Sequence, residues 1–517
     1  MRRSRSVPLF VINEDEELEI NESDESLLKR LASQPFFQIL GDVGSGTFNC
    51  AHFIRDSDGN KQVLRIGFLP DIPNNLGALK HTQKIKRGLE MVHVFQAFRP
   101  LLGPSLLIEL SRYLIIEESK IREYVNINSI CGTVRKTIEQ VKSIQAQKTF
   151  ESGDYFENNY ALQHIEYLEG GEFLAGDNQD QNTKYFAFYV FSLIWFMVMS
   201  QKAFGFRHRD LKSGNIIFRK TKTIVEYNFV LESEKNQIRY YHFESQYVPV
   251  IIDYDFATTT QSLDDFDRNV VGTHYSAPPD VLLKQLSEVF DQKYKKEIYQ
   301  EAYDWWSLGV CILELHFKGA INFFKTNCDA FARRILNGIG YRRRSQSLYW
   351  LLYSLFYSCC LASIFSGTDP NPLPPAGLYD NVEYFFGKTM QDMAEISMYL
   401  NPEYENLKIW FFQNEKKYFS AYFLSKLLHW DPHVRDLGGR PEQYLTFFEI
   451  LKSEDQPRPN THYEFRGSIR QDKIDLDTTQ FPFLRSNLCT NCFIESELMC
   501  SCCKNVFCSV ECQKVKH

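Results

Sequence analysis

The chain has 517 residues, of which 44% are hydrophobic and 24% are charged, as in ordinary soluble globular proteins. Its formal net charge of −7 argues against a protein that binds nucleic acid broadly through the phosphate backbone. The length predicts about two to four domains, and the basic N-terminus, which has only a short apolar run, does not fit a secretory signal.

The first part of the chain has the pattern of a small β-rich unit. Residues 1–35 mix basic and acidic clusters, which is typical of a mobile tail. From residue 36 the residues alternate as in strands, and the turn sequence DSDGN predicts a hairpin. A helix is expected over 80–98 and a further strand over 106–118, whereas the polar stretch 119–158 predicts an irregular insertion.

From about residue 180 the chain changes to long apolar helices, with two short strands at NIIF and VPVIIDYDF. The apolar runs at 185–199 and 348–365 are short for a bilayer span, so we expect buried core helices and no membrane partner. A β-rich part followed by a helical part predicts an α+β fold with a ligand cleft between two lobes. The polar, aperiodic residues 453–487 predict a linker.

The cysteines are distributed unevenly. Seven of the 13 fall between Cys489 and Cys512, and the other six lie among apolar neighbours. Clustered cysteines favour metal ligation in a reducing compartment over a disulfide framework. We therefore expect an intracellular, cytoplasmic protein whose scattered thiols are buried.

Residues 206–218 read FRHRDLKSGNIIF and carry a candidate catalytic group. Asn215 follows Asp210 closely, and further along the chain an apolar strand delivers Asp255 to a turn. Phosphoryl transfer requires Mg²⁺ or Mn²⁺ ions that bridge phosphate oxygens, and Asn215 and Asp255 offer the oxygen ligands that such ions prefer. Asp210 can accept the proton of an acceptor hydroxyl, while Lys212 can neutralise charge on the phosphoryl group.

These residues resemble the eukaryotic protein kinase family. HRDLKSGN matches its catalytic-loop pattern H-R-D-L-x-x-x-N, and DFA at 255–257 matches its D-F-G with Ala257 in the glycine position. Further similar motifs follow in the family's order: EYLEGGEFL at 166–174, GTHYSAP at 272–278, DWWSLGVCILEL at 304–315 and LLHWDPHVR at 427–435. The motif at 304–315 resembles the family's buried helix, and the resemblance implies that Asp304 braces the catalytic loop.

The resemblance implies a two-lobed kinase-like fold with a β-rich N-lobe and a helical C-lobe. The N-lobe and hinge would cover residues 36–175 and the C-lobe residues 176–452, interrupted by insertions at about 119–158 and 317–400. It also implies ATP as the nucleotide. Adenine would meet the backbone of Glu166 and Leu168, the ribose would meet Glu172, and the backbone at Gly44 and Gly46 would cover the phosphates.

The sequence departs from the family pattern at three places. Arg65 stands where the family has a phosphate-binding lysine and would pair with Glu90, with Glu109 and Glu117 as other acids nearby. Ala257 replaces a glycine. The family's A-P-E reads APPD at 277–280, so the acid is moved one place along, and the ion pair of this acid with Arg435 would be rearranged.

Two hypotheses about function therefore remain open. The first is an active kinase, for which Lys212 and Thr273 favour Ser/Thr hydroxyls of proteins as acceptors. The second is a pseudokinase scaffold, which the departures favour. Divergent motifs and large insertions are similar to those of kinases encoded by large cytoplasmic DNA viruses, which would place the protein in the host cytoplasm.

The last thirty residues, 488–517, have the cysteine spacing C-x2-C-x7-C-x2-C-x4-C-x3-C-x4-H. Such a short segment needs metal to fold, and the spacing suits tetrahedral Zn²⁺. It resembles the MYND and HIT-type zinc fingers, which implies two interleaved ions and a protein partner. The implied ligands are Cys489, Cys492, Cys508 and Cys512 on one ion and Cys500, Cys503 and His517 on the other, with Cys502 or water completing the shell.

Overall fold

The computed structural model describes a defined set of residues and forms two compact units. The N-terminal unit comprises residues 1–101, 106–169 and 474–517, and the C-terminal unit comprises residues 102–105 and 170–473. The described ranges are 38–45, 49–55, 59–70, 102–120, 158–173, 185–259, 274–289, 302–316, 346–365, 419–429, 431–445 and 467–473, from which residues 108, 235 and 236 are excepted. Single helical positions within 88–95, 138–147 and 328–336 are described as well.

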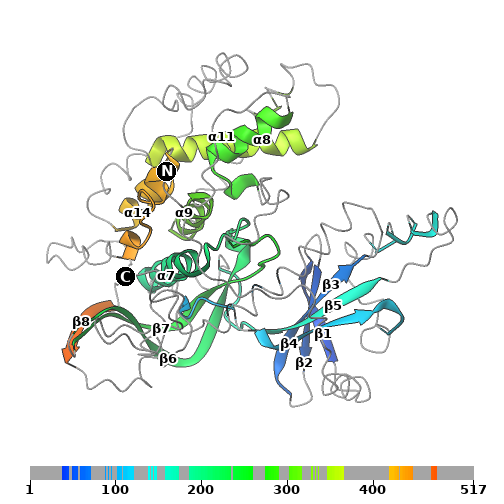
Figure 1. Cartoon of the computed structure of the whole chain (residues 1–517), viewed down its shortest axis with the longest axis horizontal. Helices are drawn as coiled ribbons and strands as arrows, with labels where there is room; N and C mark the ends of the chain where they lie inside the picture. Colours follow the sequence, from blue (N-terminus) through cyan, green and yellow to red (C-terminus); the bar gives the residue numbers. More distant parts are fainter. Residues whose placement is uncertain are drawn as a thin grey trace, which may run out of the picture. The chain divides into compact units, whose positions relative to one another are not determined.

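The N-terminal unit contains a five-stranded antiparallel sheet in the order β1-β2-β3-β5-β4 (Figure 1). Gly59 in the DSDGN turn has φ +83°, which glycine adopts without steric cost, and Arg55 pairs with Lys61 across it, so the predicted hairpin is confirmed. Phe68 and Tyr160 are fully buried with ring centroids 5.3 Å apart. The strands are β1 Gln38–Ser45, β2 Asn49–Arg55, β3 Lys61–Leu69, β4 Glu109–Glu117 and β5 Asn159–Glu166.

The sequence predicted an irregular insertion over 119–158. The structure differs in part, because the described positions within 138–147 are helical. The amide of buried Asn158 donates to Glu118 at 2.8 Å, and the Gln145 amide donates to the Asn158 oxygen at 2.8 Å. Hydrogen bonding satisfies these buried polar groups and fixes the helical segment to both ends of the stretch.

The helices of the C-terminal unit follow the apolar runs of the sequence. Helix α7 (Phe186–Phe204) is apolar on all sides over most of its length, and 14 of its 19 residues are buried. By length and composition alone α7 could cross a membrane, but 78% of its most apolar window is buried within the protein. The remaining helices are α8 Pro279–Val289, α9 Tyr303–His316, α11 Gln346–Phe365, α14 Phe419–Leu427 and α15 Pro432–Arg435, with 3₁₀ turns η3 Ser213–Asn215 and η5 His274–Ser276.

A three-stranded sheet in the order β6-β7-β8 packs against α7 (Figure 1). Its strands β6 (Ile216–Glu234) and β7 (Gln237–Ile251) form one long antiparallel hairpin, so the prediction of short strands here was wrong. Strand β8 (Gly467–Lys473) lies within the predicted linker 453–487 and pairs with β7.

Aromatic side chains on one face of this hairpin contact α7. The Phe188 ring stacks on Tyr227 at 4.8 Å, and the Phe191 ring meets Phe229 at 4.8 Å and Phe243 at 5.0 Å. Alternation along a strand then directs the residues between them to the opposite face. The hairpin thus has one face that packs against α7 and an opposite face that carries polar side chains.

Gly170 is positioned so that no side chain fits, and we expect Gly170→Ala to destabilise the protein by about 1–3 kcal/mol. A Cβ there would lie 2.6 Å from the Phe218 carbonyl oxygen, which also accepts the Gly170 N–H at 2.9 Å. Denaturant unfolding measures the change. Gly214→Ala is the matched control, since a Cβ at Gly214 meets nothing within 4 Å; equal stability of the two variants would contradict the steric argument.

Candidate active site

The loop that carries Asp210 begins where α7 ends. Gly205 caps the helix with φ 60°, in the left-handed region; its N–H donates to the Gln201 carbonyl at 2.8 Å, and the Phe206 N–H donates to the Ser200 carbonyl at 3.4 Å. The chain then runs through the predicted catalytic loop to η3 and directly into β6. The loop is therefore fixed at both ends by regular structure.

Asp304, in the first turn of α9, braces the middle of this loop as the sequence predicted. Its two carboxyl oxygens accept the N–H groups of His208 at 2.5 Å and Arg209 at 2.8 Å. Arg209 has φ 64°, which is strained for a side-chain-bearing residue, so the brace holds a conformation that the loop alone would not favour. Burial raises the pKa of the Asp304 carboxyl above its usual value, and His208 and the two N–H donors offset only part of this shift.

His208 is a packing and positioning residue, as expected from the sequence. It is fully buried, and its Nε2 lies 3.0 Å from the Ile252 carbonyl oxygen, which can only accept. Nδ1 is therefore the acceptor for the Asp210 N–H at 3.3 Å. This tautomer leaves His208 no proton-accepting role at a substrate, and its ring fixes the backbone on which Asp210 stands.

Asp210 lies in a hydrogen-bonded cluster with Lys212 and Asn215. Its Oδ2 accepts from Lys212 Nζ at 2.8 Å and from Asn215 Nδ2 at 3.3 Å, and its backbone oxygen accepts from Asn215 Nδ2 at 2.8 Å. Asp210 is 4% exposed and Asn215 6% exposed. Because the Asn215 amide nitrogen points at Asp210, the Asn215 Oδ1 atom is directed away from Asp210. Within the described part of the chain, no hydrogen bond to Asn215 Oδ1 occurs.

The segment that carries Asp255 is joined to this loop on both sides of the carboxylate. At one end Thr258 and Arg207 exchange two backbone hydrogen bonds of 2.8 Å, and at the other the Ile252 N–H donates to the Asn215 carbonyl at 2.9 Å. Asp255 lies midway between these two attachments and is 3% exposed. The fold thus brings Asp255, which lies 40 residues after Asn215 in the sequence, into the same region of the C-terminal unit as Asp210 and Asn215.

The residues predicted to hold the nucleotide fall in both units. In the N-terminal unit, Gly44 lies in β1, Arg65 lies in β3 opposite Ala51 and Gln163, and Glu166 ends β5 just before Leu168. In the C-terminal unit, Glu172 is exposed and forms a bridge with Ile217. Gly46 and Glu90 lie outside the described residues, as do all the predicted zinc ligands: Cys489, Cys492, Cys500, Cys503, Cys508, Cys512 and His517.

A buried ion pair that the sequence only partly indicated holds α8 to α15. Arg435 Nη2 lies 2.8 Å from the Asp280 carboxylate, and the Arg435 side chain is 0% exposed. The guanidinium also lies over the Trp306 ring, 5.7 Å from its centroid. The acid of APPD therefore does pair with Arg435, although it is displaced by one position from the family pattern.

Comparison with known proteins shows that part of the chain is similar to one family of domains. Residues 118–343 match the family model of the protein kinase domain, a segment that includes Asp210 and Asp255 but not Arg65. No curated protein matches the chain. Among solved structures, the crystal structure described as the kinase domain of PF14_0431 aligns at 14% identity and a TM-score of 0.42, covering 80% of this chain and 94% of that chain.

The family match supports a eukaryotic-type protein kinase with a sheet-rich N-terminal part followed by helices. A kinase domain implies ATP with Mg²⁺ as cofactors and phosphoryl transfer to proteins. The match therefore supports the coarser form of the sequence prediction over residues 118–343. Acceptor type, catalytic competence and the zinc finger are not part of what the match covers.

Proposed function

We propose that this chain, which carries a protein kinase domain, is an active kinase that transfers the γ-phosphoryl group of ATP to Ser or Thr hydroxyls of protein substrates. The observation that carries the proposal is the cluster around Asp210. A carboxylate, a cation and an amide lie in hydrogen-bond contact there, and a second carboxylate segment is joined to them at two points.

The donor set suits the cofactor that a kinase domain implies. Asn215 directs its Oδ1 away from Asp210, and Asp255 adds a buried carboxylate from the joined segment. Hard divalent ions prefer such oxygen ligands, so Asn215 and Asp255 would hold Mg²⁺. When bound, Mg²⁺ supplies charge neutralisation at the phosphate oxygens.

The chain's own residues would perform the remaining tasks. Asp210 would orient the acceptor hydroxyl and accept its proton as the oxygen attacks the γ-phosphorus. Lys212, which is paired to Asp210 and 23% exposed, would approach the transferred group and stabilise the charge that develops on it. The Asp304 brace would keep both side chains positioned without reorganisation during the reaction.

The finer features of the proposal rest on the sequence. Lys212 after the catalytic Asp favours Ser/Thr acceptors, and the cysteine spacing from Cys489 to His517 supports a zinc finger that recruits a protein partner or substrate. The reduced state that such a cysteine cluster requires suits a cytoplasmic location, which would be the host cytoplasm for a viral protein.

A pseudokinase scaffold is the second candidate, and two observations favour it. Arg65 occupies the central strand β3 where a point-charge lysine is expected, and Ala257 is fully buried where the family has glycine. Arginine is planar and longer than lysine, so the exchange changes how phosphates are bound. A scaffold would keep the fold and lose turnover.

Mg²⁺-dependent phosphoryl transfer from ATP to a generic protein substrate tests between the two candidates. We expect turnover by the wild-type chain that EDTA abolishes, and a loss of about 10²–10³ in kcat for Asp255→Asn, since one preorganised electrostatic group is removed. Both proteins should unfold at the same temperature. Background-level signal from the wild type, equal to that of Asp255→Asn, would favour the scaffold.

A further inference from the structure

The polar face of the β6–β7 hairpin gathers two glutamates and a histidine that the proposed phosphoryl transfer does not use. Glu226 on β6 is paired directly with Glu244 on β7, and Asn228 is paired with His242. These four side chains share the face opposite α7, because the residues between them pack on that helix. The grouping therefore follows from strand register rather than from proximity in the sequence.

His242 is oriented as a ligand whose second nitrogen is unused. Its residue is 4% exposed, and its Nδ1 lies 2.8 Å from Asn228 Oδ1, an acceptor, so Nδ1 carries the proton. The buried Nε2 has no hydrogen-bond partner among the described residues. Nε2 lies 3.8 Å from the Glu244 carboxylate, which is more than hydrogen-bond distance; in the neutral imidazole it carries a lone pair that faces the lone pairs of the carboxylate oxygen. A cation between them would remove this conflict.

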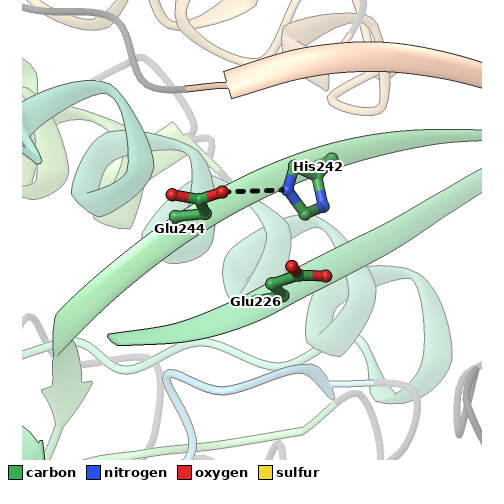
Figure 2. A group of neighbouring side chains, drawn as sticks. All are labelled: Glu226, His242 and Glu244. Atoms are coloured by element: carbon green, nitrogen blue, oxygen red, sulfur yellow. Dashed lines mark ion pairs between the residues drawn. The ribbon is translucent and has the colours of Figure 1, made fainter. Parts of the chain in front are cut away.

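The three ligand atoms are close enough to share one ion. Atoms of Glu226, His242 and Glu244 all lie within 4.8 Å of one another, and Figure 2 shows the side chains converging from the two neighbouring strands. Two ligands of one Zn²⁺ ion are at most about 4.2 Å apart, since each bond is about 2.0–2.1 Å. Glu226 is exposed and the Glu244 side chain is 47% exposed, so both can rotate inward by the small distance required.

We propose that Glu226, His242 and Glu244 form a divalent-metal site on the face of the β6–β7 hairpin opposite α7, and that Zn²⁺ is the ion that it takes. One imidazole nitrogen with two carboxylates suits Zn²⁺ and similar transition metals, whereas Mg²⁺ and Ca²⁺ prefer oxygen ligands throughout. The Asn228 oxygen would orient the imidazole ring from behind, as outer-shell acceptors do at histidine-bound metals.

The site would join the two strands at a point where their pairing is irregular. Lys220 pairs with Tyr247 but Val225 pairs with Ser245, so β6 carries extra residues just before Glu226. A metal bound across Glu226 and Glu244 would fix the register beyond this irregularity. Three protein ligands leave a fourth position for water or for a carboxylate or imidazole of a partner protein.

Metal content of the full-length protein tests the proposal without any activity measurement. The predicted C-terminal finger would bind its own zinc in every variant, so the measured quantity is the difference between variants. After equilibration with Zn²⁺ and removal of free ion, we expect Glu226→Gln and His242→Gln each to hold one zinc per chain less than the wild type. Glu442→Gln, an exposed carboxylate elsewhere in the C-terminal unit, is the matched control and should hold the wild-type amount.

Substitution with Co²⁺ separates this site from cysteine ligands. Thiolate sites give an intense charge-transfer band in the near ultraviolet, whereas a nitrogen–oxygen site gives only weaker visible bands. Glu226→Gln should lose visible absorbance and keep any thiolate band, and Asn228→Ala should weaken binding about 10–100-fold. Because Glu226 is exposed, its replacement leaves the fold intact; equal metal content and equal spectra for wild type and Glu226→Gln would overturn the proposal and leave a His242–Glu244 ion pair only.

Discussion

Asp210→Asn is expected to lower kcat for phosphoryl transfer by about 10²–10⁴, the range that a positioned general base contributes. Asparagine keeps the shape of the side chain and its contacts with Lys212 and Asn215 but cannot take up the acceptor proton. Because Asp210 would act on the acceptor and not on the nucleotide, KM for ATP should change little. Steady-state kinetics on a protein substrate at saturating Mg²⁺ gives both parameters.

Asp431→Asn is the matched control for this substitution. Asp431 caps α15 by accepting the His433 N–H at 2.9 Å, and asparagine is an equally good N-cap, so both stability and turnover should stay at the wild-type level. If Asp210→Asn kept kcat within a factor of about three while Asp255→Asn lost it, Asp210 would not be the base. The metal-binding part of the proposal would then stand alone.

Breaking the ion pair between Asp280 and Arg435 should have the largest effect on stability. Arg435 is 0% exposed, so Asp280→Asn leaves a buried guanidinium without its counter-charge. Removing one partner of such a pair costs about 3–5 kcal/mol of the free energy of unfolding. Trp305 and Trp306 are fully buried in the same unit, so tryptophan fluorescence during urea unfolding reports the loss.

A double variant distinguishes the charge effect from lost packing. Asp280→Leu combined with Arg435→Met removes both charges and keeps similar volumes, so it should recover most of the stability that Asp280→Asn loses. The methionine would still contact the Trp306 ring, over which the guanidinium lies. A double variant that is no more stable than Asp280→Asn would show that the pair acts through shape and not through charge.

Local patterns were sufficient to predict the parts of the fold that depend on neighbouring residues. The DSDGN turn predicts its hairpin because positive φ at Gly59 is a local requirement. The apolar runs predict α7 and α11 because a helix that is apolar all round must be buried. Asp304 was placed beneath the loop through the family resemblance, and the structure shows the two hydrogen bonds that this role requires.

Features that depend on long-range pairing could not be predicted in this way. The pairing of β8 with β7 joins residues such as Ser468 and His242, and nothing near either residue indicates the other. The cluster of Glu226, His242 and Glu244 depends on the register of β6 against β7, which is shifted by the irregularity before Val225. For the catalytic residues, by contrast, the motifs themselves specify the spacing, and their roles remain predictions.

The pairing of β8 with β7 has a consequence for how the chain is synthesised. Strand β7 ends at Ile251, but its neighbour β8 begins only at Gly467, so a ribosome that adds about 5–20 residues per second needs roughly 10–40 s to deliver it. During that interval one side of β7 presents unpaired backbone groups, which can pair with other nascent chains. Chains that end before Gly467 would keep this open edge permanently and should aggregate during expression.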